Sequence, residues 1–256
     1  MATTKIIAVT NQKGGVGKTT TAVNLAYYLA KSGHNVLLVD FDPQGNASSG
    51  LGIDKQKLEN SILDVVQNGS PISKVALKTK HKKLTLVPAT PQLANTEVEL
   101  AKAERRFTRL KDALLATENE YDYIVIDSPP SLSLLTVNAL IAAQYVILPV
   151  QAEFYALEGL GQLLETMQLV RKGMNPGLAL AGVLVTMFDS RTTLSGQVHE
   201  EVKKHFPGKV FKTIIPRNIR LAEAPSHGLP IGAYERWSKG ARAYKALAKE
   251  VVERVS

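Results

Sequence analysis

Short runs of apolar residues recur along the chain and alternate with longer segments of helical periodicity. The runs are rich in Val and Ile, and several contain no polar residue, which is typical of strands buried on both faces of a parallel sheet. Such strands are predicted at 6–9, 36–39, 84–87, 123–126, 145–150 and 180–186. The periodicity predicts helices at 20–31, 97–116, 134–142, 157–172 and 197–205. This pattern favours an α/β fold with a doubly wound, mostly parallel sheet flanked by helices.

The remaining segments suggest no second domain. Residues 68–71 (NGSP) have the composition of a turn rather than a linker, so we treat 1–256 as a single domain. The basic residues of 78–83 are expected to form a solvated loop before a strand. A final helix at 239–255 carries one apolar stripe, which predicts packing on the sheet. The stripe consists of Tyr244, Leu247, Ala248, Val251 and Val255. A membrane-surface helix is the alternative, but the stripe contains neither Phe nor Trp.

A glycine-rich segment, residues 11–20 (NQKGGVGKTT), separates the first predicted strand from the first predicted helix. Strand, glycine-rich turn and helix form the context of a phosphate-binding loop. Its backbone N–H groups can surround an anion, and the helix N-terminus adds further donors. Lys18 is suited to contact the outer phosphates, and the Thr19 hydroxyl is suited to bind a magnesium ion.

The loop departs from the common pattern G-x-x-x-x-G-K-[ST]. Gln12 occupies the position of the first glycine, and an additional lysine, Lys13, follows it. We expect this lysine to have a function that an ordinary phosphate-binding loop does not require.

Acidic residues follow two other predicted strands. Asp40 ends one strand and Asp42 begins the loop after it, while Asp127 ends the run 123–126. The carboxyl ends of parallel strands form the usual ligand-binding edge of such a sheet. A carboxylate there can hold magnesium or orient a water molecule for attack on a phosphate. Asp42 is the better candidate of the first pair because it lies past the strand, although an aspartate before a proline is also common in turns.

Composition excludes some chemistry and suggests an anionic partner. The chain has no cysteine, which excludes disulfides and thiolate-bound metal clusters. No apolar run is long enough to span a membrane, and no signal peptide is apparent, so a cytoplasmic location is expected. The net charge is +8, and residues 200–256 hold 12 Lys or Arg against 6 Asp or Glu. This excess favours nucleic acid or acidic lipid as a partner, with a solubilising surface as the alternative.

Six stretches of the chain form a distinctive set. They are 13–20 (KGGVGKTT), 40–46 (DFDPQGN), 126–130 (IDSPP), 149–159 (PVQAEFYALEG), 186–192 (TMFDSRT) and 215–228 (IPRNIRLAEAPSHG). Together they resemble the ParA/Soj chromosome-partitioning ATPases, a branch of the deviant Walker A ATPases. The resemblance covers essentially the whole chain.

The resemblance implies an ATP- and Mg²⁺-dependent sandwich dimer in which each subunit donates Lys13 to the partner's phosphates. Gly14 would allow the two loops to approach, and Asp42 would position the attacking water. The implied catalytic residues are Lys13, Lys18 and Asp42. The implied magnesium-binding residues are Thr19, Asp42 and Asp127. The implied nucleotide-binding residues are Lys13, Gly14, Gly15, Val16, Gly17, Lys18, Thr19 and Thr20, with Pro216, Arg217 and Asn218 on the adenine side.

The same resemblance implies sequence-independent binding to double-stranded DNA through Arg191 and Arg220, and hence association with the nucleoid. It also implies slow ATP hydrolysis that a ParB-type centromere-binding protein stimulates. The main alternative is a membrane-cycling ATPase of the MinD type, which shares the loop. The tail stripe and the surroundings of Arg191 and Arg220 argue against stable membrane association. A metabolic P-loop ligase is a second alternative, for which no substrate motif is apparent.

Overall fold

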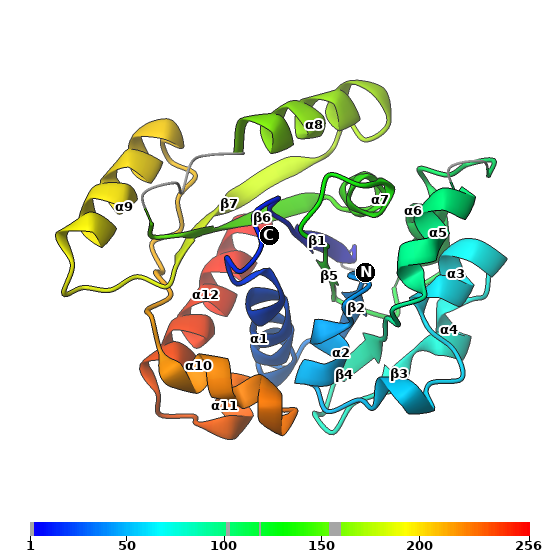
Figure 1. The fold of residues 1–256 in the computed structure, drawn as a ribbon, viewed down its shortest axis with the longest axis horizontal. Helices are drawn as coiled ribbons and strands as arrows, with labels where there is room; N and C mark the ends of the chain where they lie inside the picture. The colour runs from blue at the N-terminus through cyan, green and yellow to red at the C-terminus, as the bar shows by residue number, and fades with distance from the viewer. Residues whose placement is uncertain (1–2, 101–102, 118, 154–159) are drawn as a thin grey trace.

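A computed structural model describes residues 3–100, 103–117, 119–153 and 160–256. Its centre is a seven-stranded sheet in the order β3-β4-β2-β5-β1-β6-β7 (Figure 1). All neighbouring strands pair in parallel except β3 and β4. The strands are β1 (Lys5–Val9), β2 (Val36–Asp40), β3 (Leu77–Lys78), β4 (Leu84–Val87), β5 (Tyr123–Asp127), β6 (Tyr145–Gln151) and β7 (Ala179–Thr186). The predicted α/β fold class is confirmed.

Helices cover both faces of this sheet. They are α1 (Lys18–Lys31), α2 (Asn46–Gly50), α3 (Ile62–Asn68), α4 (Ile72–Val75), α5 (Leu93–Leu100), α6 (Arg109–Leu115), α7 (Leu134–Ala142), α8 (Leu160–Gly173), α9 (Thr193–His205), α10 (Ile219–Glu223), α11 (Ile231–Tyr234) and α12 (Lys239–Val255). Short 3₁₀ turns occur at Lys55–Lys57 and Ala224–His227. No helix in the described part of the chain is long and apolar enough to cross a membrane.

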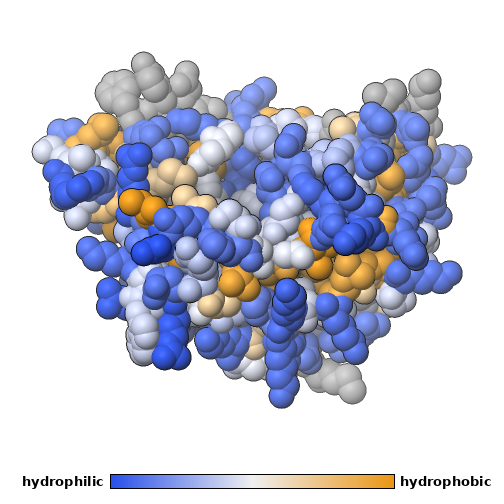
Figure 2. Space-filling model, turned by 60° about the horizontal axis from the view of Figure 1, so that its bottom comes forward, coloured by the Kyte–Doolittle hydropathy of each residue, from blue (hydrophilic) through white to orange (hydrophobic). Residues whose placement is uncertain are grey.

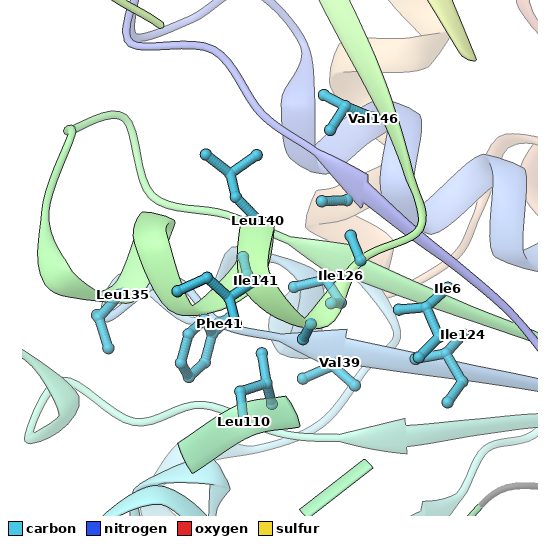
Figure 3. Packing of buried hydrophobic residues seen from close by; sticks show 14 of the residues in the cluster. Ile6, Val39, Phe41, Leu110, Ile124, Ile126, Leu135, Leu140, Ile141 and Val146 are labelled. Carbon is cyan, nitrogen blue, oxygen red and sulfur yellow. The ribbon is translucent and has the colours of Figure 1, made fainter. Parts of the chain in front are cut away.

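The two sheet faces have separate hydrophobic cores, because successive side chains of a strand point to opposite sides. In β1, Ile6 and Ala8 join the core under α3 to α9, whereas Ile7 and Val9 join the core under α1 and α12. Figure 3 shows the first core, where Phe41 packs between strand residues and α7. Burial on both faces explains why several strands of this sheet are continuously apolar.

The last helix packs as its stripe predicted. Every residue of the stripe is buried, and the helix lies against α1. Tyr244 at its centre shares a hydrogen bond of 3.1 Å with the Thr21 hydroxyl of α1. Near its C-terminus, Arg254 donates to the carbonyl oxygens of Ala181 and Val210, at 3.0 and 2.7 Å. The helix therefore joins α1 to β7 and to the segment after α9.

One predicted helix is wrong in extent. The segment 97–116 contains the end of α5 and the separate helix α6, with a turn between them in which Arg105 has a φ of 58°. The reason is a long-range contact, because the buried Asn138 donates to the carbonyl oxygen of Arg106 at 2.8 Å. The predicted helix 157–172 is α8, and its first residues, 157–159, lie outside the described residues. The stretch 149–159 is likewise described only to 153.

Two predicted loops take definite forms. Residues 68–71 join α3 to α4, with Gly69 at a φ of 70° ending α3. The basic segment 78–83 is the turn of a short antiparallel pair, β3 and β4, and most of its side chains are exposed. The antiparallel strand β3 was not predicted from the sequence because it spans only Leu77–Lys78.

Candidate functional site

The glycine-rich loop, residues 11–17, joins β1 to α1 at the carboxyl end of the sheet. Gly15 and Gly17 have φ values of 75° and 88°, which disfavour any residue with a Cβ. Two long-range contacts fix the loop, and sequence reasoning missed both. Asn11 donates to the carbonyl oxygen of Pro149 at 2.7 Å, and Thr186 donates to that of Val16 at 2.8 Å. The only sequence signal is a polar residue at the end of an apolar strand.

Lys18 extends back across the loop. Its ammonium group donates to the carbonyl oxygen of Lys13 at 2.9 Å, and the residue is 6% exposed. Burial lowers the Lys18 pKa, although the negative charges of Asp127 and Asp42 oppose this effect. A buried ammonium near two carboxylates at a helix N-terminus suits a phosphate ligand.

The additional lysine, Lys13, has a different environment. Its backbone N–H is fixed by the Asn11 side chain at 3.0 Å, while its side chain extends to Glu153. The ion pair is loose, with 3.9 Å between the ammonium nitrogen and a carboxylate oxygen, and both side chains are partly exposed. Exposed pairs of this kind contribute about 1 kcal/mol or less, so Lys13 can leave Glu153 easily. The neighbouring Gly14 is exposed, and an added Cβ would contact nothing within 4 Å.

The sheet register brings the predicted carboxylates together. Asp127 at the end of β5 pairs with Asp40 of β2 on one side and with Val9 of β1 on the other. Asp40 is fully buried and accepts two hydrogen bonds of 2.7 Å from the backbone N–H and the hydroxyl of Ser48. Burial raises the Asp40 pKa to about 6, and the Ser48 bonds oppose this rise. Because Ser48 holds its carboxylate, Asp40 orders the start of α2, a function that sequence reasoning did not foresee.

Asp127 is fully buried, and neither of its carboxylate oxygens has a hydrogen-bond partner that meets ordinary geometric criteria in the described part of the chain. Burial raises its pKa well above the ordinary value, Asp40 adds to this rise, and the Thr19 hydroxyl opposes it. A buried carboxylate without a partner is costly, so a cation or an ordered water is expected to meet it. Thr10 and Ser128 also have buried hydroxyls without a hydrogen-bond partner in the described structure.

These groups fit a magnesium ion that is held jointly with phosphates. Among the described residues, no cluster of three His, Asp or Glu side chains could hold a metal alone. Magnesium commonly takes one or two carboxylates together with phosphate oxygens and waters. The unpartnered oxygens of Asp127 beside Thr19 provide the protein part of such a site.

Asp42 lies in a well-ordered turn. It is 6% exposed, its Oδ1 accepts the backbone N–H of Gln44 at 2.9 Å, and its carbonyl oxygen accepts that of Gly45 at 2.8 Å. Lys55 donates to the carbonyl oxygen of Gln44 at 2.7 Å and closes the turn from outside. Asp42 therefore forms the turn that its position before a proline suggested, and its charge also acts on Lys18 and Asp127.

The segment Pro216, Arg217 and Asn218 lies beside the chain that follows β7. The Phe188 backbone donates to Ile215 at 3.0 Å, and the Arg217 backbone donates to Phe188 at 2.9 Å. Since Thr186 bonds the phosphate loop, this segment lies on the loop side of the sheet. The Asn218 amide oxygen is buried and has no hydrogen-bond partner in the described structure.

Arg191 and Arg220 lie on exposed elements outside the strand ends. Arg191 precedes α9 and forms two hydrogen bonds of 2.9 and 2.6 Å with the Asp189 carboxylate. Arg220 lies on α10 and pairs with Glu223 at 2.8 Å. The Arg191 side chain is 84% exposed and that of Arg220 is 54% exposed. The Arg220 pair is a surface ion pair, which contributes little to stability and can be displaced by another anion. The Arg191 pair is bidentate, and its Asp189 carboxylate is only 18% exposed, so it is the stronger of the two.

Strand, glycine-rich loop, helix and strand-end carboxylates define a P-loop ATPase. Residues 4–180 match a family described as AAA domain. The chain is 57% identical over 247 residues to the sporulation initiation inhibitor protein Soj of Bacillus subtilis, covering 96% of this chain and 98% of Soj. It is 52% identical over 250 residues to the chromosome partitioning protein ParA of Myxococcus xanthus, covering 98% of this chain and 88% of ParA. The chain therefore belongs to the Soj/ParA family of chromosome-partitioning ATPases.

Solved structures with this fold carry several names. One is described as cobyrinic acid a,c-diamide synthase from Mycobacterium smegmatis with bound ATP analogue and magnesium. It is 40% identical with a TM-score of 0.89, covering 98% of this chain and 94% of that one. Another is the septum site-determining protein MinD of Pyrococcus horikoshii with Mg-ADP. It is 26% identical with a TM-score of 0.79, covering 97% of this chain and 96% of MinD. Binding of nucleotide with magnesium is thus found among structures of this fold.

Proposed function

We propose that this chain is a DNA-segregation ATPase whose ATP-bound form is a sandwich dimer that binds DNA without sequence preference. The observation that carries the proposal is the phosphate loop. Lys18 is buried and crosses its own loop, whereas Lys13 is partly exposed, loosely paired and next to the open space at Gly14. One lysine is placed for its own nucleotide and the other is free to reach a partner subunit.

The loop residues bind the phosphates in this account. Backbone N–H groups of Gly14 to Thr20 surround them, and the Lys18 ammonium neutralises the outer ones. Thr19 and Asp127 hold a magnesium ion, with Asp42 nearby. The ion, when bound, compensates part of the triphosphate charge. Pro216, Arg217 and Asn218 form the adenine side of the nucleotide site.

Asp42 positions the water that attacks the γ-phosphate. Its turn holds the carboxylate at a fixed place beside Lys18 and Asp127. A carboxylate that orients a water accelerates hydrolysis by restricting its approach and by accepting its proton. Lys13 of the second subunit stabilises the charge that develops on the phosphates, as an arginine finger does elsewhere.

The dimer binds the backbone of double-stranded DNA through Arg191 and Arg220. Both arginines are exposed, and in the DNA-bound form phosphates replace Asp189 and Glu223 as their partners. Lys and Arg contacts to phosphates give salt-sensitive binding without sequence preference. Dimer formation doubles the number of contacts, so the nucleotide state controls DNA affinity.

The remaining parts of the proposal follow from the family. Turnover by the chain alone is slow, because the second subunit offers Lys13 in place of an arginine finger, and a ParB-type protein stimulates it. The chain acts as one domain in the cytoplasm, bound to the nucleoid, without stable membrane association. A role in partition is supported by sequence identity. The chain is 57 and 52% identical to Soj and ParA, but only 26% identical to MinD and 40% identical to the diamide synthase.

Sedimentation of Lys13→Ala tests the dimer. We expect the native chain to be dimeric with ATP and monomeric with ADP, and the variant to be monomeric with both. ATP binding by the variant should persist, because Lys18 contacts the backbone rather than the side chain of residue 13. A variant that dimerises as well as the native chain would show that Lys13 does not act across the interface.

A further inference from the structure

A basic hollow lies at the end of the sheet opposite the phosphate loop. It has a volume of about 470 Å³ between the C-terminal end of α1 and the turn that joins β3 to β4. The phosphate loop follows the carboxyl end of β1, whereas this turn precedes β4, which lies in the same parallel array. The residues lining the hollow are Tyr27, Ala30, Lys31, Gly33, Lys80, His81, Lys82 and Lys83.

The turn that carries most of the basic side chains is internally bonded. The Thr79 hydroxyl accepts the backbone N–H of His81 at 3.1 Å and donates to the Leu84 carbonyl oxygen at 2.8 Å. Lys83 has a φ of 66°, and its ammonium group donates to the carbonyl oxygen of Gly33. This bond joins the turn to the end of α1, so the lysines are presented by a fixed backbone.

The charge of the hollow is not balanced by carboxylates. In the part of the chain that the structure describes, Lys31, Lys80 and Lys82 form no ion pair. The carboxylate of Asp122, close to Gly33 in the fold, is already used by His34 and by the backbone N–H of Asn35. Burial lowers the His81 pKa, and the charges of Lys80 and Lys31 lower it further, as expected in positive surroundings.

The aromatic rings of the hollow are not free to stack on bases. Tyr27 is 7% exposed and packs edge-on against both Tyr28 and His81, with ring centroids 5.1 Å apart in each pair. Stacking on exposed aromatic faces is what single-stranded nucleic acids and free nucleobases require. The hollow therefore offers charge to a phosphate group and little to a base.

The hollow does not resemble a lipid-binding surface. The exposed large hydrophobic side chains of the described residues are Leu115, Leu169, Met174, Leu194, Ile219 and Trp237, and none of them lines it. Figure 2 brings the lower side of Figure 1 forward, and most of the visible face is hydrophilic. A surface that lacks apolar anchors is poorly suited to insertion into a membrane.

We propose that this basic hollow is a second contact for the phosphate backbone of double-stranded DNA, formed by Lys31, Lys80 and Lys82 at the end of α1 and the β3–β4 turn. The inference rests on the proposed DNA binding and extends it to a surface separate from Arg191 and Arg220. The ammonium groups of Lys31, Lys80 and Lys82 have no carboxylate partner in the described structure, although that of Lys31 also donates to the Tyr27 hydroxyl at 3.2 Å. Several cations without carboxylate partners suit consecutive phosphates of a duplex.

The test measures the affinity of the full-length chain with ATP for a short random-sequence duplex, by anisotropy over about 50 to 200 mM salt. The plot of log K against log salt has a negative slope, and each lost phosphate contact makes that slope less steep by about 0.9. We expect Lys80→Gln/Lys82→Gln to make the slope less steep by about 1 to 2 and to lower the affinity at low salt by about tenfold. The matched control, Arg171→Gln/Lys172→Gln, removes the same charge at the end of α8 and should behave as the native chain.

Equal effects of the two double variants, or no effect of either, would overturn the second contact. If the native chain itself fails to bind DNA, the proposed function fails instead. Equilibrium dialysis with labelled ATP alone distinguishes a free nucleotide as the occupant. We expect one bound nucleotide per chain in the native protein and in Lys80→Gln/Lys82→Gln. A second nucleotide that only the native chain binds would overturn DNA as the ligand.

Discussion

At the scale of single residues, the loop separates two lysines by their surroundings. Lys18 is buried and bonded within its own loop, while Lys13 is held only by its backbone and by a loose pair with Glu153. Gly14 also differs from Gly15 and Gly17 in its backbone conformation. Gly15 and Gly17 need their positive φ values, but at Gly14 neither backbone conformation nor space within the chain excludes a side chain.

This difference gives a prediction for Gly14→Val. The variant should fold and bind ATP as the native chain does, because a Cβ added at Gly14 would contact nothing within 4 Å in its own subunit. It should fail to dimerise with ATP, since two facing loops cannot approach around the added methyl groups. Sedimentation with ATP checks the assembly, and thermal unfolding checks the fold. An ATP-bound dimer of native affinity would show that Gly14 does not lie in the interface.

A second prediction concerns Asp42. Asp42→Asn keeps an acceptor for the Gln44 N–H but removes the charge, so the turn should persist while hydrolysis falls by about 100-fold or more. In Asp42→Ala the rate of hydrolysis should fall by the same factor. This variant should also lose about 1 kcal/mol of stability, because the hydrogen bond to the Gln44 N–H is lost. Single-turnover hydrolysis with saturating ATP measures both variants. Native turnover in Asp42→Asn would remove this carboxylate from the chemical step.

At the scale of elements, the sequence predicted those strands, helices and loops that a few consecutive residues determine. The apolar strands, the loop between β1 and α1, and the stripe of α12 are all encoded within a few consecutive residues, and all are confirmed. The break between α5 and α6 depends on Asn138, and the anchoring of Asp40 depends on Ser48. These contacts join segments whose pairing no periodicity reveals, which is why the sequence did not predict them.

The C-terminal helix has such an unpredicted anchor in Glu250. Its carboxylate accepts the backbone N–H groups of Lys212 and Thr213 at 2.8 and 2.9 Å and pairs with Arg254 at 2.8 Å. Burial alone would raise the Glu250 pKa, but these hydrogen bonds stabilise the charged form and lower it below 4.5. Gly182 is required beside this anchor, because an added Cβ would lie 2.7 Å from the backbone carbonyl oxygen of Lys209.

We expect Glu250→Gln to lower the free energy of unfolding by about 2 kcal/mol at pH 7. Because the folded-state pKa is lowered, this stabilisation is present above pH 4.5 and is lost as pH falls through the folded-state value. Urea unfolding across pH 3 to 7 should therefore show the two proteins converging in acid. Glu253→Gln, exposed on the same helix, is the control and should change stability by less than about 0.5 kcal/mol. A pH-independent difference would contradict the charge-based anchor.

At the scale of the whole molecule, the sheet gathers the site and distributes the surface charge. Its register places Asp40 and Asp127 side by side next to β1, so one edge holds the loop and the carboxylates. The charge excess of residues 200–256 could be read from the sequence, but the exposure of Arg191 and Arg220 required the fold. The basic hollow at the opposite end joins residues of α1 to a distant turn, and no single stretch predicts it.

We propose above all that ATP controls DNA binding by this chain. The most direct measurement is the affinity for random-sequence duplex DNA against salt, with ATP, with ADP and without nucleotide, for the native chain and for Arg220→Glu. The account predicts tight binding with ATP alone, a log K that falls linearly with log salt, and loss of this binding in Arg220→Glu with ATP binding retained. Equal affinity with ATP and ADP, or binding that ignores salt, would contradict it.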